Sequence, residues 1–138
     1  MPSIVIPGQY ESLAQVAAFI RTACQEADLD DFAAYQVETA VDEACTNIID
    51  YAYGGEGHGS IRCSYHISPD DLTITLEDNG MPFNPKGVKQ PDIHAPLGER
   101  EARGLGLFII QQWMDDVRFE FLGGQNILTM VKHLTKAG

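Results

Sequence analysis

Positive charge is scarce in this chain. Nine lysines and arginines stand against twenty aspartates and glutamates, which gives a formal net charge of -11 over 138 residues. A protein that binds nucleic acid needs clustered positive charge to neutralise the phosphates, so this balance argues against a nucleic-acid partner. It is compatible with a basic protein partner, although acidic surfaces often serve solubility alone.

Cysteines and long apolar runs are also few. The three cysteines have an odd count and no CxxC spacing, and the four histidines have no ligand spacing, so we expect neither disulfides nor a zinc site. No stretch approaches the length of a membrane span, and the opening residues MPSIVIPG lack the basic region of a signal peptide. We therefore expect one cytoplasmic domain over residues 1–138, with no membrane association.

The spacing of apolar residues predicts an α+β fold. Helical spacing covers about residues 11–27, 31–53 and 104–115, and strand patterns cover residues 3–6, 60–68, 72–78, 117–122 and 126–134. This order predicts a two-layer sandwich, with helices packed on one face of a mixed, mainly antiparallel sheet. The intervening residues 79–103 are rich in proline and glycine, and a connection of that length is usually functional or disordered.

Two polar side chains share a face of the second predicted helix. Glu43 and Asn47 lie four residues apart, on the shoulder of the apolar stripe, where a side chain can line a pocket. A carboxylate that can take a proton, beside an amide oxygen that can ligate a hard cation, suits phosphate chemistry with magnesium. Taken alone, however, such a pair is more often part of a solvated helix surface.

Asp78 ends a strand on the side that faces the core. It has the same parity as Leu72, Ile74 and Leu76, so its carboxylate points toward the buried face of the sheet. A carboxylate on that side needs a partner. The amino group of a ligand and a neighbouring backbone amide are both open as that partner.

Arg103-Gly104-Leu105-Gly106 leads from the long loop into the third predicted helix. Glycines allow the backbone to approach a ligand closely, and the start of a helix offers free N–H groups and a positive dipole end to phosphate. The chain has no G-x-x-x-x-G-K-[ST] motif, and the G-x-G lacks the preceding strand and later glycine of a dinucleotide-binding fold.

In order and spacing, these motifs resemble the ATP-binding boxes of the superfamily that includes DNA gyrase, heat-shock chaperones of the ninety-kilodalton class, MutL and histidine kinases. The resemblance is closest to its anti-sigma-factor serine kinases, the switch-protein kinases of bacterial partner switching. It covers essentially the whole chain and implies a Bergerat-type ATP-binding fold. The matching boxes are Glu43-x-x-x-Asn47 with Tyr51-Ala52-Tyr53, then Asp78-x-Gly80-x-Pro82-Phe83, then Gly104-Leu105-Gly106-Leu107. Pro82 is a departure, because other superfamily members more often have glycine there.

The resemblance also implies roles for single residues. Asn47 would hold Mg2+ on the triphosphate of ATP, Asp78 would accept the adenine amino group, and Gly80 would let the purine approach the backbone. Glu43 would be the general base, and Arg103 is a candidate for steadying charge on the transferring group. The segment Gly104, Leu105 and Gly106 would offer backbone amides to the phosphates, under a lid of roughly residues 84–103.

The function implied is that of an ATP-dependent protein-serine kinase, which phosphorylates an anti-sigma-factor antagonist and is also a candidate to sequester a sigma factor. A nucleotide-dependent binding module without phosphotransfer is the alternative. The catalytic half of a histidine kinase is disfavoured, since the chain shows no phospho-accepting helical hairpin, and a dimer-clamping ATPase normally brings a transducer domain. Because relatives commonly dimerise, a homodimer is also compatible with the resemblance.

Overall fold

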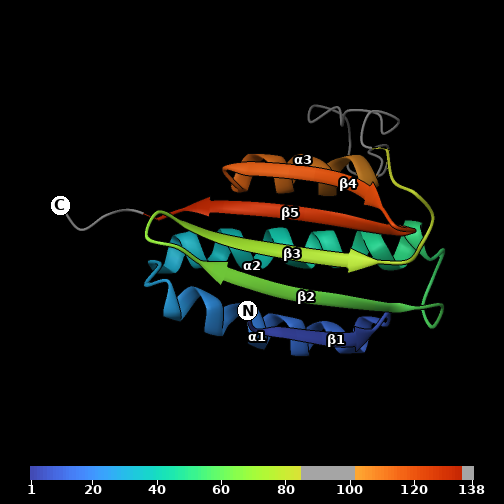
Figure 1. Cartoon of the computed structure of the whole chain (residues 1–138), viewed down its shortest axis with the longest axis horizontal. Coiled ribbons are helices and arrows are strands. Elements are labelled where there is room, and N and C mark those ends of the chain that lie inside the picture. The colour runs from blue at the N-terminus through green and yellow to red at the C-terminus, as the bar shows by residue number, and fades with distance from the viewer. Residues whose placement is uncertain (85–101, 135–138) are drawn as a thin grey trace.

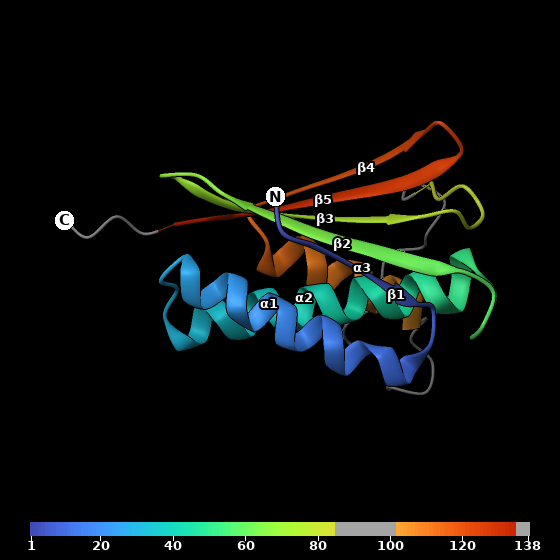
Figure 2. The ribbon, with the colours of Figure 1, turned by 60° about the horizontal axis from the view of Figure 1, so that its bottom comes forward.

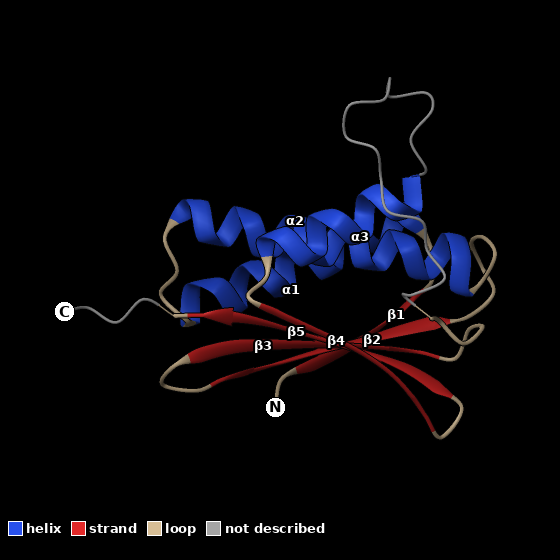
Figure 3. Cartoon of the chain, turned by 90° about the horizontal axis from the view of Figure 1, so that it is seen from above, coloured by secondary structure: helices blue, strands red, loops and turns tan. Residues whose placement is uncertain are grey.

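The computed structural model describes residues 1–84 and 102–134, with the side chains of Ala102 and Arg103 outside that description. Five strands form one sheet in the order β1-β2-β3-β5-β4, and each neighbouring pair is antiparallel. All three α-helices lie on one face of this sheet (Figure 1, Figure 3). The predicted α+β two-layer fold is thus confirmed. The strands are β1 Ser3–Pro7, β2 Ser60–Ile67, β3 Asp71–Asp78, β4 Asp116–Leu122 and β5 Gln125–His133.

The helices begin and end close to the predicted positions. A 3-10 turn at Tyr10–Ser12 precedes α1 (Leu13–Glu26), and α2 (Asp31–Asn47) is followed by a π-helical turn at Ile48–Ala52. Helix α3 spans Ala102–Trp113. Helix α2 lies between α1 and α3 and contacts both (Figure 2). No helix within the described ranges is long and apolar enough to cross a membrane.

The core lies between the helices and the inward face of the sheet. Along β3 every second residue is buried, so Leu72, Ile74 and Leu76 pack inward, as the alternation predicts. Cys45 on α2 and Cys63 on β2 are also buried as free cysteines. Burial raises the pKa of both thiols, which keeps them protonated and unreactive.

Lys132 fixes the far end of α3. Its Nζ donates to the Trp113 carbonyl oxygen at 3.0 Å and to Gln36 Oε1 on α2 at 2.8 Å. A cation at the end of a helix satisfies a free carbonyl and complements the negative end of the dipole. Helix α3 is therefore held against both α2 and β5, which sets where its first turns lie.

The π-helical turn is the main difference from the predicted elements. The sequence predicts one helix over residues 31–53, but after Asn47 the turn widens and the Tyr53 amide donates to the Ile48 carbonyl oxygen at 3.0 Å, five residues back. Ala52 at its end accepts from the Met81 amide at 2.8 Å. The wider turn therefore joins the end of α2 to the chain that leaves β3.

Candidate functional site

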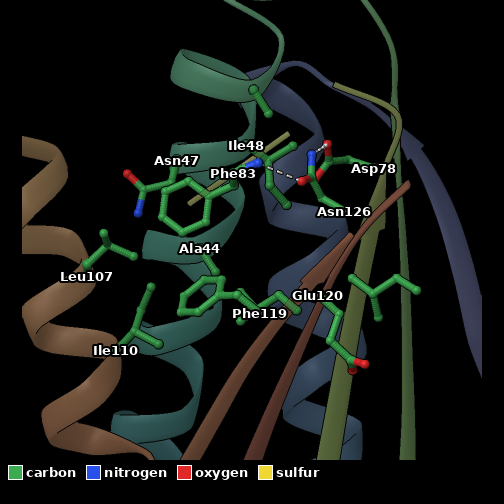
Figure 4. Close-up of a pocket in the computed structure, with 13 residues that line it drawn as sticks. Ala44, Asn47, Ile48, Asp78, Phe83, Leu107, Ile110, Phe119, Glu120 and Asn126 are labelled. Carbon is green, nitrogen blue, oxygen red and sulfur yellow. Dashed lines mark hydrogen bonds between the residues drawn. The ribbon is translucent and has the colours of Figure 1, made fainter. Parts of the chain in front are cut away.

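A pocket opens between α2, α3 and the neighbouring parts of β3, β4 and β5 (Figure 4). It contains about 490 Å3 of space, including the part that is open to solvent. Asn47 and Asp78, two of the predicted site residues, line it on opposite sides, and the rings of Phe83 and Phe119 pack together there with centroids 4.9 Å apart. The other lining residues are Ala44, Ile48, Ala52, Leu107, Ile110, Glu120, Asn126, Ile127 and Leu128.

Asp78 is buried, with 5% of its surface exposed. Its Oδ1 accepts two hydrogen bonds, from the Gly80 amide at 2.8 Å and from Asn126 Nδ2 at 2.9 Å. Burial raises the pKa of the Asp78 carboxyl, while these two hydrogen bonds act in the opposite direction. Within residues 1–84 and 102–134 no donor reaches Oδ2. The backbone amide is therefore one partner, and the second oxygen is available to a ligand.

Asn126 is a site residue that the sequence-based prediction did not include. It is 8% exposed, and besides Asp78 its Nδ2 contacts the Met81 carbonyl oxygen at 2.9 Å. Its Oδ1 accepts from the Phe83 amide, also at 2.9 Å. The same parity argument that selects Asp78 would have found it, because Asn126 shares a strand face with Leu128 and places a polar group on the buried side.

The amide nitrogen of Asn47 lacks a partner in the part of the chain that the structure describes. Among the described residues, its Nδ2 is the buried side-chain polar atom for which no hydrogen bond is found. Leaving such a group unpaired costs roughly 1–3 kcal/mol, so the position is suited to a polar ligand. The side chain points toward α3 (Figure 4). Since an amide can also present its oxygen there, the site fits a hard cation together with phosphate oxygens.

Gly106 brings α3 close to the polar pair on α2. A Cβ at this glycine would lie 3.0 Å from Glu43 Oε2 and 3.3 Å from Asn47 Nδ2. The structure thus places Glu43, Asn47 and Gly106 together. Glu43 is half-buried and is not among the residues that line the pocket. Burial raises the pKa of its carboxyl, and the neighbouring charge of Asp42 raises it further.

The start of α3 lies two residues before its predicted position. The helix begins at Ala102, so Gly104 and Leu105 lie within its first turns and Gly106 is its fifth residue. Only the first N–H groups of a helix lack partners inside it. Gly104 is therefore placed to offer an amide at the helix start, and Gly106 allows the close approach to α2. The predicted contact of this segment with phosphates stays a prediction. The Arg103 side chain and residues 85–101 of the predicted lid lie outside the described residues.

Gly80 is packed against the π-helical turn. A Cβ at Gly80 would lie 2.6 Å from both the carbonyl carbon and the carbonyl oxygen of Ala52. The close approach seen in this structure is therefore one between two backbone segments. The predicted approach of a purine to Gly80 stays a prediction.

We expect Gly80→Ala to destabilise the protein by about 1–3 kcal/mol, the usual range for overpacking. The added methyl group meets backbone atoms of Ala52, which cannot turn aside as a side chain can. Chemical denaturation measures the change. Gly123→Ala is not a suitable control because Gly123 has a φ of +61°. Gln15→Ala, at an exposed position on α1, is the better one, and an equal stability loss in both variants would contradict the packing argument.

Comparison with known proteins agrees with this architecture. Residues 6–132 match the family of histidine kinase-like ATPase domains. The Serine-protein kinase RsbW of Listeria innocua is 36% identical over 104 residues, which cover 72% of this chain and 66% of that protein. Its counterpart in Bacillus mycoides is 35% identical over 104 residues, covering 72% and 64%. The chain thus spans just under two thirds of the length of these relatives.

Two solved structures share the fold. The catalytic domain of histidine kinase ThkA superposes with a TM-score of 0.57 at 14% identity, covering 98% of this chain and 99% of that one. The Acinetobacter baumannii histidine kinase AdeS gives a TM-score of 0.54 at 11% identity, covering 99% and 69%. Identities this low carry the fold alone. The match over residues 6–132 shows the family: the chain belongs to the histidine kinase-like ATPase domains and is related to the RsbW serine-protein kinases.

Proposed function

We propose that this protein is an ATP-dependent protein-serine kinase of the anti-sigma-factor type. It transfers the γ-phosphoryl group of ATP to a serine of an antagonist protein, and it also binds a sigma factor. The observation that carries the proposal is an apolar pocket with two polar atoms on opposite sides, Asp78 Oδ2 and Asn47 Nδ2, for which the described part of the chain supplies no hydrogen-bond partner. The relatives named as serine-protein kinases support the choice of acceptor.

The pocket suits an adenine nucleotide. Asp78 Oδ2 is a hydrogen-bond acceptor for the amino group of the base, and the apolar walls, with Phe83 and Phe119, suit the flat faces of the ring. Gly104, Leu105 and Gly106 lie in the first turns of α3, beside Asn47, where the phosphates would lie, and Gly104 is close enough to the helix start for its amide to lack a partner within α3. Asn47 is the residue that would hold Mg2+.

The chain's own residues then have separate tasks in the transfer. Bound magnesium supplies charge neutralisation on the phosphate oxygens. Asn47 orients the phosphates relative to α3, and the apolar walls of the pocket hold the base. Glu43 accepts the proton of the serine hydroxyl as it attacks, and the raised pKa of its half-buried carboxyl makes it a stronger base than an exposed glutamate. Arg103 is proposed to steady charge on the transferring group.

The proposal is tested by incubating the protein with γ-labelled ATP, magnesium and each candidate antagonist from the same genome. We expect label on a serine of one antagonist. A second candidate function, a binding module that uses ATP without transferring phosphate, is favoured by the position of Glu43 outside the pocket lining. ATP binding by calorimetry with no label on any antagonist would support that module, and no ATP binding would exclude both functions.

The sigma factor is tested separately. Gel filtration of the protein with each candidate sigma factor, with and without ATP, should show one complex that depends on nucleotide. The homodimer expected from relatives is measured in the same runs by light scattering. If the protein labels an antagonist but forms no complex with any sigma factor, the proposal is limited to phosphotransfer.

A further inference from the structure

We propose that Asn126 is a positioning residue which sets the base specificity of the pocket, so that the pocket selects a 6-aminopurine over a 6-oxopurine. The inference rests on the proposed function, because it requires that a purine nucleotide binds in the pocket. It concerns a residue on β5 that contacts Asp78 directly, since the two are paired across β3 and β5.

The orientation of the Asn126 amide is fixed by its partners. Its Nδ2 makes its two shortest hydrogen bonds to Asp78 Oδ1 and to the Met81 carbonyl oxygen, each at 2.9 Å. Its oxygen accepts from the Phe83 amide at 2.9 Å. Turning the amide over would set its oxygen against two acceptors and its nitrogen against a donor. The hydrogen bonds therefore allow only one orientation.

This orientation determines what Asp78 presents to the pocket. With Asn126 and the Gly80 amide both donating to Oδ1, the carboxylate is held against rotation, and Oδ2 remains for a ligand. An ionised carboxylate oxygen only accepts hydrogen bonds. It pairs with the amino group of a 6-aminopurine and faces the carbonyl oxygen of a 6-oxopurine as a second acceptor.

Fixation of the carboxylate is what turns this pairing into selectivity. A carboxylate free to rotate can accept instead from the N1–H of a 6-oxopurine, and if protonated it can donate to the carbonyl oxygen. Asn126 opposes both routes, because it holds the carboxylate in place and its hydrogen bond favours the ionised form against the effect of burial. Without Asn126, the Gly80 amide alone would hold Oδ1, and the carboxylate would be less firmly fixed.

Asn126 also anchors the chain after β3 through Met81 and Phe83, and the Phe83 ring packs on Phe119 in the pocket. A substitution there is therefore expected to weaken all nucleotides to some degree. The ratio of the affinities for a 6-aminopurine and a 6-oxopurine nucleotide distinguishes a positioning role from a general loss of pocket structure. A loosened pocket would lower both affinities by the same factor and leave the ratio unchanged.

The test measures the affinities of ADP and inosine diphosphate by calorimetry, since the two differ at purine position 6. We expect the wild-type protein to prefer ADP on the order of 10²-fold, as for a polar site that faces the wrong group. Asn126→Leu, of similar size but unable to form these hydrogen bonds, should lower that ratio at least about tenfold. Asn126→Thr keeps a donor opposite Asp78 and should retain most of the ratio. Thr129→Val, on the opposite face of β5, is the matched control.

The outcomes are distinct. A ratio that falls in Asn126→Leu and is retained in Asn126→Thr supports the inference. Equal weakening of ADP and inosine diphosphate in Asn126→Leu, with the ratio unchanged, would show a structural role only and overturn it. Wild-type protein that binds ADP without preferring it to inosine diphosphate would also overturn it, while leaving the proposed kinase function standing. Wild-type protein that binds neither nucleotide would remove the proposed function itself.

Discussion

Replacing Glu43 by glutamine should lower the rate of phosphoryl transfer about 10²–10⁴-fold, the usual contribution of a general base. Glutamine has nearly the same shape, so the contact with Gly106 across the α2–α3 interface is kept, but it cannot take the proton of the serine hydroxyl. Because Glu43 does not line the pocket, we expect the affinity for ATP to stay within about threefold of wild type. Single-turnover transfer and calorimetry measure the two quantities.

Asp42→Asn is the matched control for that variant. Asp42 is the adjacent carboxylate on α2, it is exposed, and its charge contributes to the raised pKa of Glu43. Its removal should change the transfer rate only slightly. Wild-type transfer in Glu43→Gln would exclude Glu43 as the base, and a parallel loss of ATP affinity would show that the carboxylate is needed to hold α3 in place.

The fold was predictable from sequence because its elements have clear periods. Leu72, Ile74 and Leu76 alternate along β3, and the buried residues of α1 and α2 recur at helical spacing, so the binary pattern alone places each element on the core. Strand order followed less directly, since β5 pairs with β3 and leaves β4 at the edge. That arrangement depends on contacts between residues far apart in the chain.

The candidate site was predictable only in part. Asp78 and Asn47 were found because parity and helical spacing define which way a side chain points. The π-helical turn was not, because it is stabilised by a contact with Met81, which lies 29 residues beyond Ala52. The phosphate-binding role predicted for Gly106 stays a prediction, and the structure adds that its missing side chain lets α3 approach Glu43 and Asn47. Such roles are set by tertiary packing, and local patterns do not contain them.

Asp78→Asn should reverse the hydrogen-bonding character of the pocket without unfolding it. The Gly80 amide and Asn126 Nδ2 are both donors, so the new amide must place its oxygen where Oδ1 lies and its nitrogen where Oδ2 lies. Both internal hydrogen bonds are thereby kept. Removing a buried charge also relieves the desolvation that raises the pKa of Asp78, so we expect no fall in melting temperature.

The reversed pocket then presents a donor to the base. We expect ADP affinity to fall on the order of 10²–10³-fold, because an amino group would face another donor, and we expect inosine diphosphate to become the preferred ligand. Calorimetry with both nucleotides measures this. Glu77→Gln, the neighbouring carboxylate that pairs with Arg62 at 3.7 Å, is the control and should alter neither affinity. Unchanged ADP binding would remove Asp78 from the site. A loss of both nucleotides without reversal would mean that the amide does not adopt the orientation that Gly80 and Asn126 impose.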